Sequence, residues 1–342
     1  MTVVRLALVG VGNVGQSFLE LLRDRGDAVR DRYGLDLRLV LAADRSGAAV
    51  DPAGLDPAGL LVLKQLGRGV ATGQGGQPGA AAAEALAAVA ADVLLEATLT
   101  DLHTGQPGLD LMCIAFEHGM HVVSANKGPL VLAYRDLVGR AAQAGRQLRF
   151  SGAVCAGLPT INIGRRDLVA AQIDRVEGIF NSTTNYILQS MSANAAYETA
   201  LAEAQRMGVA EADPSLDVQG WDTANKLVII ANSVLNYPAR LDEVEVTGMT
   251  LVTPGALQAA QAGGRRIKLL ATALRRPDGS YRLRVAPTPL PIDHFLAQTN
   301  GWEMGIVYYT DIYGVLSAKV DERGPLPTGS AMLRDVIDIY RG

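Results

Sequence analysis

The chain has 342 residues, of which 49% are hydrophobic and 19% are charged, and its formal net charge at pH 7 is −4. This composition excludes a disordered chain, and the slight negative charge argues against a nucleic-acid-binding protein. Domains typically hold about 100–200 residues, so the length predicts two of them. No apolar run reaches the roughly 18 residues that a membrane span needs, so we expect no membrane partner.

The numbers and spacing of cysteines and histidines indicate in which compartment the protein works and whether it binds zinc. The two cysteines, Cys113 and Cys155, are too few for a disulfide framework and favour the reducing cytoplasm. The four histidines show no zinc-ligand spacing, because His118 and His121 have no third ligand near them in the sequence. The apolar N-terminus looks superficially like a signal peptide, but its glycines and the polar helix after it favour a buried first strand.

The first half of the chain alternates short apolar strands with helices. Strands are expected at residues 3–9, 37–43, 92–97, within 121–129 and at 146–154. Helices are expected at residues 17–33, 81–91, 109–118 and 131–145. This alternation predicts an α/β fold with a Rossmann-type, doubly wound parallel sheet.

Residues 46–80 interrupt this pattern with glycine, alanine and proline. They include the near-duplication DPAGLDPAGL at 51–60 and the run ATGQGGQPGA at 71–80. The segment is either a binding loop or a mobile surface segment, and its composition favours the surface segment.

After about residue 155 the pattern changes to that of a mixed α+β domain. Helices are expected at residues 160–172, 184–206 and 219–235. The runs KLLATAL, YRLRVAPTPL and MGIVYYTDIYGVLSAKV then predict strands. The segment TGSAMLRDVIDIYRG predicts a last helix, with Thr328 or Ser330 as its N-cap.

A glycine motif lies between the first strand and the first helix. Gly10, Gly12 and Gly15 fit G-x-G-x-x-G, with Asn13 and Val14 between the last two glycines. The first glycine permits a tight turn, the second lets the backbone approach a pyrophosphate, and the third lets the helix pack on the strand. The helix N-terminus would face the anion. A dinucleotide site is therefore favoured over a plain strand–turn–helix connection.

Asp44 and Arg45 follow the second strand and bear on which dinucleotide binds. Asp44 lies 29 residues after Gly15, and an acid there would accept a bond from the ribose 2′-hydroxyl of NAD. Arg45 would instead hold the 2′-phosphate of NADP. A solvated turn is the alternative to both, so the choice between NAD and NADP stays open.

Polar residues follow two further strands of the predicted sheet. Thr98, Thr100 and Asp101 come after the third strand, where they would line the cofactor or cap the next helix. Lys127 ends the run Ser-Ala-Asn-Lys after the fourth strand. From this edge of the sheet it would reach a substrate oxygen or the nicotinamide, unless it is a surface lysine in a turn.

The densest polar cluster is the segment AEADPSLDVQGWDTANKL. It holds Glu211, Asp213, Asp217, Asp222 and Lys226. The last two are four residues apart and would share one face of a helix that the following apolar run buries. Buried charges are costly unless they are paired or used, which indicates a functional site. The alternative is an exposed acidic loop with a simple salt bridge.

Together these segments resemble homoserine dehydrogenase over most of the chain. The motifs in order are VGVGNVG, SANKGPL, AVCAGLPTI, GIFNSTTNYIL, EAQRMGVAEADPSLDVQGWDTANKL and GPLPTGSAMLRDVIDI. The resemblance implies NAD(P)H-dependent interconversion of L-aspartate 4-semialdehyde and L-homoserine, on the route to threonine and methionine. It implies a dinucleotide-binding domain (1–149 with 325–342), a catalytic and dimerisation domain (150–324), and a homodimer.

The resemblance also implies roles for single residues. Lys226 would donate the proton to the developing alkoxide, with Lys127 as the second lysine of the family's pair and Asp222 positioning the lysine or the substrate. The residues implied to bind substrate are Glu211, Asp217, Ser182 and Thr183. Those implied to bind the cofactor are Gly10, Gly12, Asn13, Val14, Gly15, Asp44, Arg45, Thr98, Lys127 and Gly324.

The chain departs from the family pattern beside an implied cation site. The family often has a glutamate at the position of Ser151, and it helps to bind a monovalent cation (Na⁺ or K⁺). The other ligands would be the backbone carbonyls of Val154, Ala156 and Leu158. Ser182 also replaces the family's usual glycine, and the turn before PTGSA is shorter than usual. Because the chain ends after its last helix, we expect no regulatory ACT domain, no fused aspartate kinase, and no feedback through either.

Two other functions compete with this reading. Aspartate-semialdehyde dehydrogenase needs an activated cysteine, but Cys155 has no adjacent histidine and Cys113 lies in an apolar helix. A non-enzymatic NAD(P)-binding sensor would have no reason to bury Lys226 opposite an acidic cluster.

Overall fold

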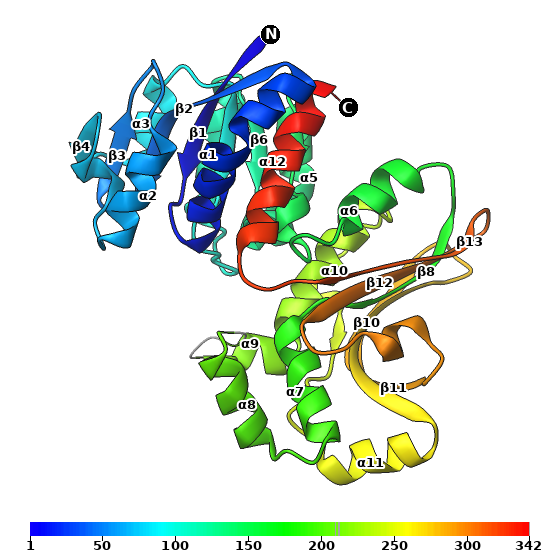
Figure 1. Cartoon of the computed structure of the whole chain (residues 1–342). Coiled ribbons are helices and arrows are strands. Elements are labelled where there is room, and N and C mark those ends of the chain that lie inside the picture. Colours follow the sequence, from blue (N-terminus) through cyan, green and yellow to red (C-terminus); the bar gives the residue numbers. More distant parts are fainter. Residues whose placement is uncertain (209, 211–212, 342) are drawn as a thin grey trace. The chain divides into compact units, whose positions relative to one another are not determined.

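The computed structural model describes residues 1–208, 210 and 213–341. The chain divides into two compact units, Met1–Gly157 with Pro325–Gly342, and Leu158–Gly324. Figure 1 shows the helices and strands of each unit. No helix in the described ranges is both long and apolar enough to cross a membrane.

The first unit is built on a seven-stranded sheet with the order β4-β3-β2-β1-β5-β6-β7. Its parallel strands are β1 (Thr2–Val9), β2 (Leu35–Asp44), β5 (Val93–Glu96), β6 (His121–Ser124) and β7 (Leu148–Arg149). They are short apolar runs because helices cover both faces of the sheet, and Leu6, Leu8 and Leu94 are fully buried. The predicted doubly wound parallel sheet is confirmed.

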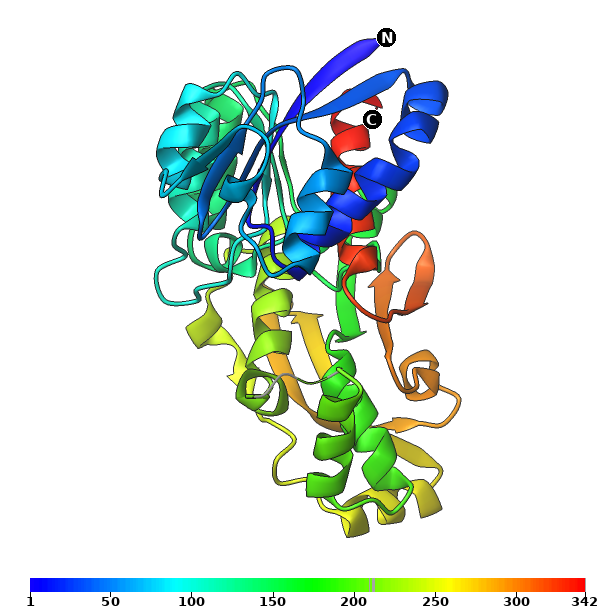
Figure 2. The same ribbon diagram turned by 60° about the vertical axis from the view of Figure 1, so that its left-hand side comes forward.

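Two groups of helices cover this sheet. One group contains α1 (Asn13–Tyr33), α2 (Pro57–Gln65) and α12 (Leu326–Arg341), and the other contains α3 (Ala82–Ala88), α4 (Gly108–Glu117) and α5 (Lys127–Gln143). Figure 2 shows the sheet between the two groups. At Gly329 the helix α12 approaches α1 so closely that an added Cβ would lie 2.9 Å from the Phe18 backbone nitrogen. Because α12 begins at Leu326, the expected caps Thr328 and Ser330 lie inside the helix, and that prediction is wrong.

Residues 46–80 extend the sheet. They contain β3 (Gly47–Val50), α2, the 3₁₀ turn Val70–Thr72 and β4 (Gly76–Pro78). Strand β3 pairs antiparallel with β2, and β4 pairs antiparallel with β3. The segment is therefore not an irregular loop, because backbone pairing can order a segment that is poor in large apolar side chains. Its mobility stays a prediction.

The second unit is built on a six-stranded sheet with the order β13-β12-β8-β10-β11-β9. The strands are β8 (Ile173–Ile179), β9 (Glu245–Val246), β10 (Arg265–Arg275), β11 (Tyr281–Pro291), β12 (Glu303–Thr310) and β13 (Gly314–Asp321). All neighbouring pairs are antiparallel except β11 with β9. The α-helices are α6 (Thr160–Asn162), α7 (Ser182–Ser192), α8 (Tyr197–Arg206), α9 (Ser215–Val218), α10 (Trp221–Ser233) and α11 (Pro254–Ala262).

Several predicted elements differ from those of the structure. The helix expected at 184–206 is two helices, α7 and α8, separated by Asn194 with φ 72°. The helix expected at 160–172 is the single turn α6 followed by a π-helical turn, Ile163–Asp167. The strand expected at 146–154 pairs only in β7, and a 3₁₀ turn, Ser151–Ala153, follows it. Periodicity alone did not reveal these breaks, because the apolar residues continue across each of them.

Candidate active site

The glycine loop of the first unit has the geometry of a nucleotide-binding turn. Gly10 has φ 99°, and a Cβ there would lie 2.3 Å from the carbonyl carbon of Ala97. A Cβ on Gly15 would lie 2.1 Å from the oxygen of Gly10, whereas a Cβ on Gly12 would meet nothing within 4 Å. Gly12 is the N-cap of α1, whose first turn contains no acidic residue. The positive end of the helix dipole therefore has no carboxylate of its own in that turn, which suits an anionic ligand.

Asp44 at the end of β2 is engaged by its own unit. Its carboxylate accepts bonds from the Ser46 nitrogen (2.9 Å) and hydroxyl (2.6 Å), and it forms an ion pair of 2.7 Å with Lys64 of α2. Burial alone would raise the pKa of Asp44, but the bonds from Lys64 and Ser46 outweigh it and lower that pKa. Arg45 is exposed. Lys64 was not among the predicted site residues, because nothing in the sequence indicates that α2 brings it back onto Asp44.

Lys127 is the first residue of α5 and is half-buried. The preceding residue, Asn126, is the N-cap of that helix and accepts a bond of 3.0 Å from the Gly128 nitrogen. The Asn126 amide also donates to the Thr98 hydroxyl at 3.2 Å, so the loops after β5 and β6 are joined. Lys127 is therefore not a surface lysine in a loose turn, because it begins a capped helix.

Lys226 and Asp222 form a buried ion pair on α10. The Lys226 Nζ lies 2.8 Å from Asp222 Oδ2 and donates to the Phe180 carbonyl at 2.6 Å. The two side chains are only 13% and 9% exposed. The alternative of an exposed acidic loop with a simple salt bridge is therefore wrong for this pair.

Asn181, which was not among the predicted site residues, joins this pair to Asp217. Its Nδ2 donates to Asp217 Oδ1 at 2.7 Å and to Asp222 Oδ2 at 2.9 Å. Its Oδ1 accepts a bond from the Thr184 nitrogen at 2.9 Å, which caps α7. An asparagine directly before a Ser-Thr-Thr helix start is a recognisable N-cap signal. No sequence pattern, in contrast, indicates that the Asn181 amide nitrogen contacts Asp217 and Asp222.

The remaining predicted substrate and cofactor residues are placed as follows. Ser182 and Thr183 open α7 directly after Asn181, and Thr183 is buried. Glu211 lies outside the described residues. Gly324 has φ 78°, the left-handed region that favours glycine, and a Cβ there would meet nothing within 4 Å.

Ser151, where the family often has a glutamate, contacts a different carboxylate. The Ser151 nitrogen and hydroxyl donate to Asp335 of α12 at 2.7 and 2.6 Å. Asp335 is fully buried, and burial raises its pKa to about 6. In the adjoining loop Cys155 and Ala156 have φ 55° and 44°. Alkali cations take oxygen ligands, and the Asp335 carboxylate is one such group beside Ser151. No cluster of three or more His, Cys, Asp or Glu side chains suited to a metal occurs in the described ranges.

Neither cysteine has the surroundings of a catalytic nucleophile. Cys155 is buried, and burial raises the pKa of the partly buried Cys113. Catalytic thiols need a lowered pKa, which argues against the aspartate-semialdehyde dehydrogenase alternative.

Comparisons with known proteins cover both units. Residues 10–151 match the family described as "Homoserine dehydrogenase, NAD binding domain", and residues 159–337 match "Homoserine dehydrogenase". The chain is 35% identical over 336 residues to a homoserine dehydrogenase of Methanocaldococcus jannaschii, covering 98% of each chain. It is 31% identical over 342 residues to an NAD(+)-dependent homoserine dehydrogenase of Pseudomonas canavaninivorans, covering all of this chain and 97% of that one.

Solved structures of homoserine dehydrogenases also match the chain. A putative homoserine dehydrogenase from Archaeoglobus fulgidus matches with a TM-score of 0.90 and 34% identity, over 99% of this chain and 100% of that one. One from Thiobacillus denitrificans matches with a TM-score of 0.85 and 30% identity, over 100% of this chain and 74% of that one. The chain therefore belongs to the homoserine dehydrogenase family and is an NAD(P)-dependent oxidoreductase.

Proposed function

We propose that this enzyme interconverts L-aspartate 4-semialdehyde and L-homoserine with NAD(P)H. The observation that carries the proposal is the buried Lys226–Asp222 pair at 2.8 Å, to which Asn181 joins Asp217. A buried ammonium held by a carboxylate can give a proton to an oxygen that gains negative charge during reduction. The sensor alternative does not account for this arrangement.

A coenzyme held at the glycine loop would supply a hydride to the aldehyde carbon and would accept it back in the reverse direction. Lys226 gives a proton to the carbonyl oxygen as its negative charge develops. Asp222 holds the ammonium in place, and Asn181 fixes the orientation of the Asp222 carboxylate. Lys127 is the second cation that stabilises the developing charge. Asp217 and Glu211 bind the ammonium group of the substrate, with Ser182 and Thr183 beside it.

The two units divide these tasks. The first would be the dinucleotide-binding domain, and the second the catalytic and dimerisation domain, with boundaries near residues 149 and 325. The glycine loop supports the first assignment, through the open space beside Gly12 at the start of α1. The Lys226 cluster, which consists of Lys226, Asp222, Asn181 and Asp217, supports the second assignment.

The coenzyme is NAD or NADP, and we propose that NADP is accepted. Lys64 neutralises Asp44, so the carboxylate that would repel a 2′-phosphate is compensated, and Arg45 beside it adds a positive charge. We also propose that Na⁺ or K⁺ binds the carbonyl oxygens of Val154, Ala156 and Leu158. In this chain Asp335 would provide the nearby negative charge in place of the missing glutamate.

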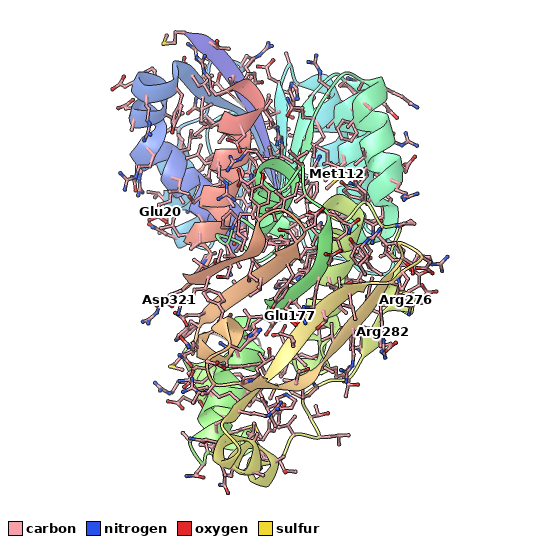
Figure 3. The ribbon with its side chains drawn as sticks, turned by 90° about the vertical axis from the view of Figure 1, so that its right-hand side faces the viewer. Glu20, Met112, Glu177, Arg276, Arg282 and Asp321 are labelled. Carbon is pink, nitrogen blue, oxygen red and sulfur yellow. The ribbon has the colours of Figure 1, made fainter. Side chains whose placement is uncertain are left out.

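We propose that the enzyme is a homodimer. Cross-strand partners place Val315, Tyr309, Arg175 and Leu274 in one row on a face of the second sheet. Val315 is 62% and Leu274 is 47% exposed, and apolar side chains exposed in this way suit a second copy of the chain. Figure 3 looks onto this sheet, with Glu177 on β8 and Arg282 on β11. The molar mass measured by light scattering tests the proposal.

The proposed cellular role is cytoplasmic biosynthesis of threonine and methionine. The chain has two cysteines, too few for a disulfide framework, which suits a reducing compartment. Complementation of a homoserine auxotroph tests the pathway assignment.

The reaction is tested with the purified chain, L-homoserine and either NAD⁺ or NADP⁺ at alkaline pH. Reduced coenzyme is expected to accumulate at 340 nm only when homoserine is present. Binding of coenzyme without turnover of homoserine or the semialdehyde would support the sensor. Steady-state constants with both coenzymes decide the preference.

A further inference from the structure

Glu96, the last residue of β5, is a carboxylate with no exposed surface. Burial raises its pKa, and the cost of burying it is offset by hydrogen bonds from four donor groups. Oε1 accepts from the Thr98 nitrogen (2.9 Å), the Thr98 hydroxyl and the Asn126 amide (3.3 Å). Oε2 accepts from the Ser124 hydroxyl at 2.9 Å. None of the proton chemistry described above uses this residue.

The donors lie at the ends of two neighbouring strands, where proposed site residues also lie. Thr98 lies in the loop after β5, Ser124 is the last residue of β6, and Asn126 directly precedes Lys127. The side-chain amide of Asn126 makes hydrogen bonds at both of its ends. Its Oδ1 accepts a bond from the Gly128 nitrogen, and its Nδ2 donates to Glu96. Nδ2 also donates to the Thr98 hydroxyl at 3.2 Å and to the Leu99 carbonyl at 3.5 Å. The carboxylate, which binds both Asn126 and Thr98, therefore helps to fix which way this amide is turned, and with it the first turn of the helix that Lys127 begins.

We propose that Glu96 is a positioning residue, which holds Thr98 and, through Asn126, the start of α5 with Lys127 in the geometry for coenzyme binding and hydride transfer. The proposal rests on the proposed function of Lys127 and Thr98. Glu96 acts only through these neighbours, since its side chain has no exposed surface with which to touch a ligand.

The hydrogen bonds of Glu96 allow a substitution that removes its negative charge but keeps the positions of its partners. Among the described residues, the partner of Oε2 is the Ser124 hydroxyl, and the Ser124 Oγ also lies 3.5 Å from the Asn126 carbonyl. A glutamine amide nitrogen at Oε2 can donate to this hydroxyl, whose proton then turns to that carbonyl. Its oxygen at Oε1 keeps the bonds from Thr98 and Asn126. Glu96→Gln thus keeps the geometry without the charge, while Glu96→Ala removes every acceptor.

The test measures coenzyme affinity, kcat and KM in three variants. Glu96→Ala is expected to weaken coenzyme binding about tenfold or more and to lower kcat by up to about 100-fold. Glu96→Gln is expected to stay within about threefold of the natural chain for both. Leu94→Ala is the matched control, because Leu94 is fully buried in the same strand but donates no side-chain bond. It should lower the melting temperature and leave the affinity unchanged.

A second variant keeps the proposal falsifiable if Glu96→Ala does not fold. Asn126→Asp retains the acceptor that caps α5 but places a carboxylate against Glu96. Because two adjacent carboxylates raise one another's pKa, a proton shared between them can restore the lost bond. Coenzyme affinity of Asn126→Asp is expected to recover as the pH falls from 8 to 6, while that of the natural chain changes less. An affinity that stays equal to that of the natural chain at every pH would overturn the proposal.

Two results overturn the role of Glu96 directly: a folded Glu96→Ala enzyme with unchanged affinity and kcat, or a Glu96→Gln enzyme as impaired as Glu96→Ala. These outcomes are distinct from failure of the proposed function. If the natural chain does not oxidise homoserine, the proposed function fails, and coenzyme affinity in the variants still tests Glu96.

Discussion

Lys226 and Asp222 lie one helical turn apart with 2.8 Å between Nζ and Oδ2, and solvent reaches little of either side chain. A buried ion pair contributes little net stability, because desolvation of both charges offsets their attraction, whereas removing one partner leaves a costly unpaired charge. Such a pair is therefore better explained by proton chemistry than by folding.

Replacing Lys226 by alanine is expected to lower kcat by about 10²–10⁴-fold, the usual contribution of a general acid. Coenzyme affinity should be unchanged, because the glycine loop belongs to the first unit. Lys319→Ala is the matched control, since Lys319 is 40% exposed and pairs with Glu303 at 3.0 Å in the same unit. Steady-state kinetics and a coenzyme titration check both. Unchanged turnover in the Lys226 variant would show that another group supplies the proton.

In the glycine loop, one alanine substitution is expected to lower the stability of the fold, and another is expected to weaken coenzyme binding without changing the stability. Gly10→Ala should destabilise the fold by roughly 1–3 kcal/mol or more, because the residue has φ 99° and the added Cβ would lie 2.3 Å from the Ala97 carbonyl carbon. Gly12→Ala should leave the melting temperature unchanged, because its Cβ meets nothing within 4 Å, and should weaken coenzyme binding. Thermal unfolding and coenzyme titration measure both. Full affinity in folded Gly12→Ala would place the pyrophosphate elsewhere.

Removing the Lys64 ammonium is expected to change the coenzyme preference. In Lys64→Ala the Asp44 carboxylate loses its ion pair of 2.7 Å and would repel a 2′-phosphate. The ratio of kcat/KM for NADP⁺ to that for NAD⁺ should fall about tenfold or more. Lys319→Ala again serves as the control. An unchanged ratio would mean that the 2′ position of the ribose lies away from Asp44.

Lys268 predicts a pH dependence of stability. Its side chain is 4% exposed and donates to Asn185 Oδ1 (2.8 Å) and to the Thr299 carbonyl (2.5 Å). Burial, with a smaller effect of Arg266, lowers its pKa from 10.5 to about 8. Between pH 8 and 10.5 the unfolded chain binds this proton more tightly than the folded one, so the free energy of unfolding should rise with pH.

The expected gain is about 3 kcal/mol across that window, measured by urea unfolding at several pH values. Lys268→Met should be less stable at every pH, because two acceptors lose their donor, and should lack the rise assigned to Lys268. A difference between the two proteins that is independent of pH would contradict the lowered pKa.

The parallel sheet and the candidate site differ in how far the sequence predicts them. Strand β1 and the glycines after it follow from local pattern, because an apolar run, a tight turn and a helix are each encoded within a few residues. The pairing of Asp222 with Lys226 follows from helical spacing. In these cases the interacting groups are neighbours in the sequence.

Contacts between distant segments were not predictable in this way. Nothing near Asn181 indicates that its amide meets Asp217, and nothing near Ser151 indicates Asp335, which lies in the last helix. By its sequence Glu96 belongs to an apolar strand, and its four donor groups lie at or just beyond the ends of two different strands. Such contacts depend on how strands are ordered in the sheet, which a single sequence does not specify.

The way residues 46–80 fold back on Asp44 has an evolutionary consequence. Ser46, Lys64 and the Val70 nitrogen all bind that one carboxylate. The group expected to meet the ribose is thus held by residues 46–80 at the edge of the sheet, a segment that shares no residue with the Lys226 cluster. In related enzymes, changes confined to this segment are therefore expected to shift the choice between NAD and NADP, while the residues proposed to transfer the proton stay the same.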